Sequence, residues 1–118
     1  MEYQFIERMP KCIKPEDIMH HISSKGCPVD IYLQNEFITF GITTIPPGNR
    51  LGRMAAHGGD EIYYILEGDC IVECPRHRTE FKLSKGDIFH IPAGQIHAPR
   101  NDSDKDVRIL WACTPLWP

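Results

Sequence analysis

Hydrophobic and polar residues alternate along much of the chain from Val29 onward, and turn residues interrupt the alternation about every ten positions. Residues 37–45 are rich in β-branched and aromatic side chains and end at Pro46-Pro47-Gly48-Asn49. Apolar side chains again occupy every second position over residues 107–113. Successive side chains of a strand point to opposite faces, so this pattern predicts half-buried strands. Short strands at such regular spacing are typical of a β-sandwich or barrel, and the sequence predicts an all-β fold.

Four shorter strands are expected between these two segments. They cover residues 61–66, 70–74, 80–83 and 88–91. Glu67-Gly68-Asp69 predicts a three-residue hairpin connection, with the glycine where a positive φ is needed. The basic stretch Arg76-His77-Arg78 lies between two of the strands and is read as a turn.

The first thirty residues carry the weakest signal. Residues 14–22 are expected to form either an extended segment or a short helix, in which Pro15 would lie in the first turn and two acidic residues at the positive end. Gly26-Cys27-Pro28 would then end it. The expected organisation is an N-terminal extension over residues 1–30, followed by a barrel over residues 31–118.

Composition and charge narrow the function classes. The chain has 118 residues, which is the length of one domain, and a formal charge of −3. No basic cluster indicates nucleic-acid binding, and the longest uncharged run, residues 37–49, is too short and too broken to span a bilayer. The N-terminus lacks the pattern of a signal peptide, and the five cysteines form no CxxC pair, so reduced thiols in a cytoplasmic protein are expected.

The histidines and one carboxylate provide the candidate chemistry. His57 and Glu61 have equal parity, so in an extended segment they face the same side, and Gly58-Gly59 between them could instead form a bend. His97 follows a turn after a strand that would pair nearby. Two imidazoles and one carboxylate can hold a divalent metal with open positions, as in catalytic zinc or non-heme Fe²⁺ sites.

The spacing of these residues resembles the two motifs of the cupin superfamily. The second motif, G-x5-P-x-G-x2-H-x3-N, is matched at each defined position by Gly86, Pro92, Gly94, His97 and Asn101. The first motif, G-x5-HxH-x3,4-E-x6-G, is matched at His57, Glu61 and Gly68, whereas Ala55 replaces its first histidine and Gly48 fits its leading glycine only with one extra residue.

The resemblance implies a double-stranded β-helix, or jelly roll, with one divalent metal ion. His57, Glu61 and His97 would be the ligands, with Fe²⁺ favoured and Zn²⁺, Mn²⁺ or Ni²⁺ as alternatives. Two outcomes stay open. The loss of one imidazole at Ala55 leaves either an extra open coordination position or a decayed site in which the histidines only make hydrogen bonds. A buried Glu61 without a cation would be costly, which favours a bound metal.

Two further residues are candidates for catalysis. Tyr63 shares the parity of Glu61 and could present its hydroxyl to a substrate, although a core aromatic side chain is an equal alternative. Arg53 shares the parity of His57 and could pair with a substrate carboxylate or phosphate, although a solvated arginine is the more ordinary interpretation.

The resemblance supports two functional hypotheses. The first is a metal-dependent enzyme acting on an oxygenated small molecule, by oxygenase, isomerase, decarboxylase or lyase chemistry, with an iron-dependent oxygenase as the leading subclass. The second is a non-catalytic module that binds a metabolite or a metal. Because a fold alone does not determine a reaction, the enzyme hypothesis and the binding-module hypothesis both stay open. Small cupin barrels commonly pair through an edge strand and the N-terminal segment, so a homodimer that uses residues 1–30 is expected.

Overall fold

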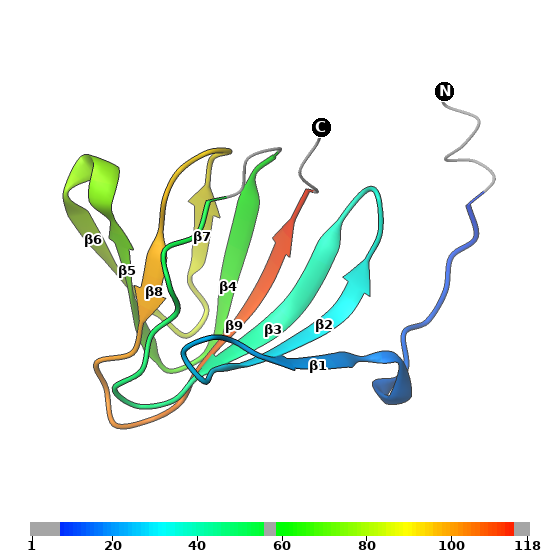
Figure 1. Cartoon of the computed structure of the whole chain (residues 1–118), viewed down its shortest axis with the longest axis horizontal. Helices are drawn as coiled ribbons and strands as arrows, with labels where there is room; N and C mark the ends of the chain where they lie inside the picture. The colour runs from blue at the N-terminus through cyan, green and yellow to red at the C-terminus, as the bar shows by residue number, and fades with distance from the viewer. Residues whose placement is uncertain (1–7, 56–58, 115–118) are drawn as a thin grey trace.

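The protein forms two antiparallel β-sheets that face each other, as a computed structural model describes for residues 8–55 and 59–114 (Figure 1). The six-stranded sheet has the order β1-β2-β3-β9-β4-β7, and the three-stranded sheet has the order β6-β5-β8. The strands are β1 (Met19–Ile22), β2 (Pro28–Gln34), β3 (Thr39–Ile45), β4 (Glu61–Glu67), β5 (Asp69–Cys74), β6 (Thr79–Ser84), β7 (Ile88–Ile91), β8 (Ala98–Arg100) and β9 (Val107–Cys113).

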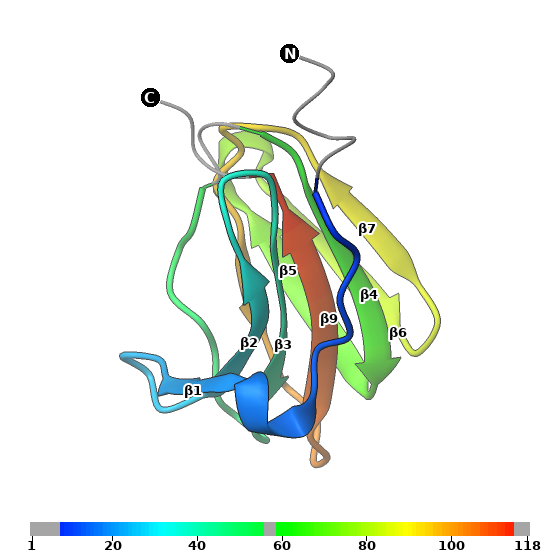
Figure 2. The ribbon, with the colours of Figure 1, turned by 90° about the vertical axis from the view of Figure 1, so that its right-hand side faces the viewer.

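The last strand of the chain lies in the middle of the larger sheet. β9 pairs with β3 on one side and with β4 on the other, so residues far apart in sequence become neighbours. In this register Glu61 lies opposite both Cys113 of β9 and Ile91 of β7. The larger sheet curves around the smaller one, as the view from the side shows (Figure 2). This arrangement is the expected jelly roll, and the all-β prediction is confirmed.

Of the two forms expected for the N-terminal segment, helical or extended, residues 14–22 mainly take the extended one. Only Pro15–Asp17 form a single 3₁₀ turn, η1, and Met19–Ile22 form the edge strand β1. The acidic residues and Pro15 do start a helical turn, but a helix this short gains little without an apolar face to bury. Pairing of β1 with β2 satisfies the backbone instead.

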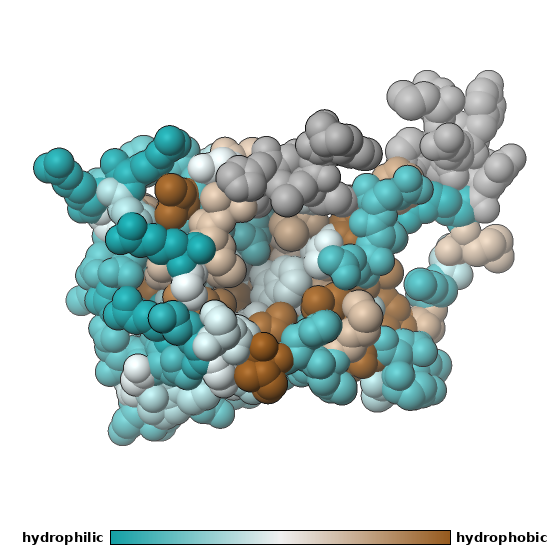
Figure 3. Space-filling model, viewed as in Figure 1, coloured by the Kyte–Doolittle hydropathy of each residue, from teal (hydrophilic) through white to brown (hydrophobic). Residues whose placement is uncertain are grey.

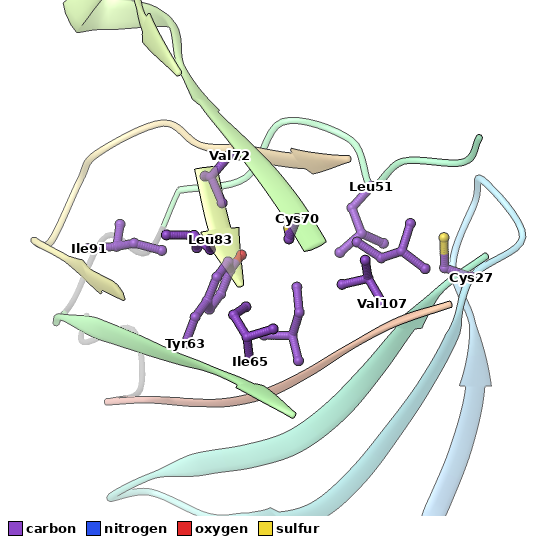
Figure 4. Close-up of a cluster of buried hydrophobic side chains, with 11 residues drawn as sticks. Cys27, Leu51, Tyr63, Ile65, Cys70, Val72, Leu83, Ile91 and Val107 are labelled. Atoms are coloured by element: carbon purple, nitrogen blue, oxygen red, sulfur yellow. The ribbon is translucent and has the colours of Figure 1, made fainter. Parts of the chain in front are cut away.

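A cluster of apolar side chains fills the space between the sheets. Tyr63 and Ile65 of β4 point toward Cys70 and Leu83 of the smaller sheet (Figure 4). The other members of the cluster are Cys27, Ile45, Leu51, Val72, Ile91, Val107 and Ile109. The alternation predicted for β4 is confirmed, because Tyr63 and Ile65 are buried while Ile62 and Tyr64 are exposed.

The connection between β4 and β5 is not the predicted hairpin, because β4 belongs to the larger sheet and β5 to the smaller one, and the two strands do not pair. The chain crosses between the sheets at Gly68, where the positive φ expected from the sequence is present. Gly68 has a φ of +83°, and a Cβ atom there would lie 2.5 Å from the carbonyl oxygen of Asp106. Both observations require glycine. The basic stretch after β5 also forms the expected turn: Pro75–His77 make the 3₁₀ turn η2, and Arg78 has a φ of +50°.

Hydrophilic side chains cover the part of the molecule around β5 and β6, while hydrophobic side chains lie in the middle of the same view (Figure 3). All five cysteines are free thiols. Among the described residues, no helix has the length and apolar character that crossing a bilayer requires.

Asn101, the final position of the second motif, ties the loop between β8 and β9 to the end of β3. Its side chain is fully buried, and its amide group donates hydrogen bonds to the carbonyl oxygens of Ile45, at 2.8 Å, and Lys105, at 2.6 Å. Its side-chain oxygen accepts from the backbone N–H and hydroxyl of Ser103. The asparagine of the motif therefore has a structural role, and its side chain bonds to no residue of the candidate site.

We expect Asn101→Ala to destabilise the fold by about 2–4 kcal/mol, because two backbone carbonyl groups would lose their donor in the interior. Urea unfolding followed by circular dichroism measures the change. Gln34→Ala is the matched control, because it removes an exposed amide. Equal free energies of unfolding for the two variants would contradict the assigned role of Asn101.

Candidate metal centre

Glu61 and His97 meet at one end of the space between the sheets. Glu61 is the first residue of β4, and His97 directly precedes β8. A turn positions His97: the backbone N–H of Gln95 donates to the carbonyl oxygen of Pro92, and Gly94 has a φ of +81°. The backbone of His97 then exchanges two hydrogen bonds of 2.8 Å with Met54. The second motif therefore holds its histidine through its turn residues.

The His97 ring is oriented with one nitrogen toward the Glu61 carboxylate. Its side chain is 1% exposed, and Nε2 lies 3.0 Å from Oε1 of Glu61. The contact lacks the alignment of a hydrogen bond, so Nε2 has no hydrogen-bond partner among the described residues. At the other end of the ring, Nδ1 lies 3.0 Å from the carbonyl oxygen of Gln95. A carbonyl oxygen only accepts, so Nδ1 carries a proton and, in the neutral ring, Nε2 has a free lone pair.

Two electron-rich atoms, Nε2 of His97 and Oε1 of Glu61, thus lie 3.0 Å apart in the interior. A cation bound to both would stabilise them. A proton is one such cation. Burial acts most strongly on the pKa of His97 and lowers it, but the Glu61 carboxylate and the Gln95 carbonyl group together outweigh burial and raise the pKa above its usual value. A divalent metal ion is the other. A metal-bound histidine commonly donates its second N–H to a carbonyl oxygen, as Nδ1 does here. The Glu61 carboxylate and the Nε2 atom of His97, which has no hydrogen-bond partner among the described residues, are therefore suitable ligands for a metal ion.

The third predicted ligand, His57, lies outside the described residues. Ala55, two positions earlier, lines a cavity together with Glu61 and His97 and brings no donor atom on its side chain. Within residues 8–55 and 59–114, no group of three or more histidine, cysteine, aspartate or glutamate side chains is arranged to hold a metal. The assignment of His57, Glu61 and His97 as the complete ligand set therefore stays a prediction.

Two adjacent cavities reach the Glu61 carboxylate. The inner one, of about 260 Å³, also borders Tyr63, and the outer one, of about 510 Å³, also borders His97. Met54, Glu61 and Trp111 line both of them. The remaining inner residues are Val29, Thr43, Leu51 and Ile109, and the remaining outer residues include Ile31, Gln34, Asn35, Thr39, Cys113 and Thr114.

The structure places the two predicted catalytic residues differently. Tyr63 is 3% exposed, borders the inner cavity, and packs edge-on against the His97 ring with 5.8 Å between ring centroids. Burial, and then the nearby Glu61 carboxylate, raise the pKa of Tyr63, so its hydroxyl keeps its proton. Arg53 is exposed and borders a separate hollow with Glu73 and Glu80, so the structure does not bring it to the cavities at Glu61.

Three residues at this site carried no site prediction from the sequence. Met54, Cys113 and Trp111 border the cavities, and Trp111 donates its Nε1–H to Oγ1 of Thr43 over 2.9 Å. Burial, and then Glu61, raise the pKa of the Cys113 thiol. These residues reach Glu61 through the pairing of β4 with β9 and the bridge between residues 54 and 97. The alternation of apolar residues over 107–113 indicated that Trp111 and Cys113 face the interior. It did not indicate that they would lie near Glu61.

The two-sheet barrel, with a histidine and a carboxylate at one end of its interior, defines the cupin class of proteins. Residues 41–113, well over half of the chain, match the model of the Cupin domain family. The chain belongs to that family, as the motif resemblance predicted.

Two known proteins are similar to this chain in sequence. It is 28% identical over 97 residues to the oxalate-binding protein of Thermotoga maritima, covering 82% of this chain and 74% of the relative. It is 26% identical over 103 residues to human centromere protein C, covering 84% of this chain but only 10% of that protein. The chain therefore corresponds to a small part of the centromere protein.

Solved structures show the same fold. A predicted oxalate decarboxylase from Thermotoga maritima superposes with a TM-score of 0.73 at 24% identity, covering 90% of this chain and all of the other. A polyketide cyclase from Streptomyces resistomycificus gives a TM-score of 0.74 at 16% identity, covering 90% of this chain and 80% of the other. At sequence identities below 25%, the similarity to these two structures shows a shared fold and nothing about function.

Proposed function

We propose that this protein is a metal-dependent cupin that acts on an oxygenated small molecule. The observation that supports the proposal is the buried Nε2 of His97, which lacks a hydrogen-bond partner among the described residues and lies 3.0 Å from a Glu61 oxygen. His57, Glu61 and His97 would hold the ion, and Fe²⁺ is the favoured metal. A bound divalent ion would supply Lewis acidity toward a carbonyl or hydroxyl oxygen of the substrate.

The protein's own residues would position the substrate and exclude water. Gln95 fixes the tautomer of His97 through its carbonyl oxygen, and Tyr63 packs against the ring edge. Tyr63 also borders the inner cavity and keeps its hydroxyl proton, so it would serve as a hydrogen-bond donor wherever a ligand reaches that hydroxyl. Arg53 has no support from its position, because it borders neither cavity.

We expect the purified protein to bind one divalent ion per chain, and both Glu61→Gln and His97→Gln to lose most of it, because each removes one donor. Elemental analysis after dialysis against Fe²⁺, Zn²⁺, Mn²⁺ or Ni²⁺ in turn measures the content. His20→Gln is the matched control, because His20 is an exposed histidine of β1 paired with Asp30. Substoichiometric metal in the wild-type chain for all four ions would contradict the proposal, as would full metal content in Glu61→Gln.

The leading reaction subclass is an iron-dependent oxygenase, and its activity would require Fe²⁺ and consume oxygen. Turnover of an identified substrate at the same rate under nitrogen would remove this subclass.

A non-catalytic binding module is the second candidate function. The name of the oxalate-binding relative favours it, since that protein is named for binding and not for a reaction. Ligand-dependent thermal stabilisation without any turnover, across a broad set of metabolites, would support the binding module over the enzyme.

We also propose a homodimer that uses the N-terminal segment. All four residues of β1 are exposed, and β1 is an edge of the larger sheet, with Met19 45% and Ile22 70% exposed. An exposed edge strand with apolar side chains is a ready surface for pairing with another chain. Light scattering should give twice the monomer mass, and Ile22→Asp should lower it. A monomeric mass for the unmodified chain would contradict this arrangement.

A further inference from the structure

The walls of the cavities at Glu61 are mainly apolar. Trp111, Ile109, Leu51 and Val29 surround the inner cavity, and the Thr43 hydroxyl in its wall already accepts the indole N–H of Trp111. Glu61 is the single charged side chain among the described residues that border this cavity. A ligand that enters it meets hydrocarbon and aromatic surface on most sides.

Cationic side chains are missing from both cavities. No lysine or arginine lies among the described residues that border the inner or the outer cavity. The remaining parts of this chain, residues 1–7, 56–58 and 115–118, contain neither residue type in their sequence. Side chains of the outer cavity contribute neutral groups instead, from Gln34, Asn35 and Thr39. A bound ion at Glu61 and His97 is therefore the one strong positive charge that this chain would offer a ligand.

The inner cavity has the size of a substituted ring. An engineered apolar cavity of roughly 150 Å³ in another protein binds benzene. The inner cavity here measures about 260 Å³, and Met54, Glu61 and Trp111 separate it from the outer cavity as walls that the two share. A ring-sized body would fit the inner cavity, with a substituent directed toward Glu61 and His97.

We propose that the ligand of this site has an apolar, ring-sized body and a single oxygen donor, and is not a small dicarboxylate. The proposal deepens the proposed function and rests on it, since the oxygen donor would meet the ion held by Glu61 and His97. The apolar body gains free energy by leaving water, at about 25 cal/mol per Å² of buried apolar surface. A small dicarboxylate could bind the ion through both carboxylates, but its outer oxygens would then lie among apolar walls such as Trp111 without a cationic partner, which is unfavourable in an apolar site.

Two probes of opposite character test the proposal: 4-methylphenol, a neutral ring with one oxygen donor, and oxalate, a dianion without an apolar body. Calorimetry measures the binding of each to the metal-loaded and to the metal-free full chain. The metal content is measured again after each titration, so that removal of the ion by oxalate is not counted as binding. We expect 4-methylphenol to bind both forms, and to bind the metal-loaded form at least about tenfold more tightly than oxalate does.

The outcomes separate the two proposals. Tighter binding of oxalate than of 4-methylphenol by the metal-loaded chain would overturn the ligand class, and so would the absence of 4-methylphenol binding to either form. If no metal loads but 4-methylphenol binds the metal-free chain in preference to oxalate, the metal proposal fails and the ligand class stands.

A charge introduced at the junction of the cavities provides a second test. Met54 borders both cavities and is 37% exposed, so Met54→Lys places a cation there without filling the core. We expect this variant to shift the preference for 4-methylphenol over oxalate toward oxalate by about tenfold. Met9→Lys is the matched control, because Met9 is 84% exposed and borders neither cavity. An equal preference in the two variants would contradict the assigned role of the cavity walls.

Discussion

The contact between Nε2 of His97 and Oε1 of Glu61 is the constraint on which the site depends. The atoms are 3.0 Å apart, His97 is almost fully buried, and the Gln95 carbonyl oxygen accepts a hydrogen bond from the N–H of the opposite ring nitrogen. The neutral imidazole therefore leaves an unprotonated nitrogen next to a carboxylate oxygen, which is unfavourable unless a cation binds both. A proton or a divalent ion meets this requirement. The raised pKa of His97 is the response of the chain when the cation is a proton.

The rest of the fold holds that contact in place. The turn that ends in Gln95 positions His97, and two backbone hydrogen bonds with Met54 hold it there. The pairing of β4 with β9 brings Glu61 to the same end of the sheets. The same pairing sets Trp111 against the cavity that Glu61 borders. The polar pair and the apolar cavity are therefore two consequences of one strand arrangement, and together they determine which ligands fit.

Local patterns in the sequence were sufficient for β3 to β7 and for β9, because alternation and turn residues act within a few positions, but they did not predict β1 or β8. The turn of the second motif was also predictable, since Gly94 has a local geometric role that few other residues satisfy. For residues 14–22 the local preference left a helix or an extended segment open, and pairing with β2 selects the extended form. The cavity walls were not predictable from the sequence either. Cys113 reaches Glu61 only through the pairing of strands more than forty residues apart, and Arg53 shares strand parity with His57 but lies where the chain is not a strand.

The central claim is that a divalent ion, and not a proton, joins Glu61 to His97. Thermal unfolding with and without each of Fe²⁺, Zn²⁺, Mn²⁺ and Ni²⁺ tests it most directly, because an ion that binds only the folded chain raises its stability, by about 2.7 kcal/mol at a hundred times its Kd. We expect at least one ion to raise the unfolding midpoint of the wild-type chain, and Glu61→Gln to abolish the rise. The contrary result is a midpoint that no ion changes and that falls as the pH rises through the raised pKa of His97, since stability gained from a bound proton is lost in that direction.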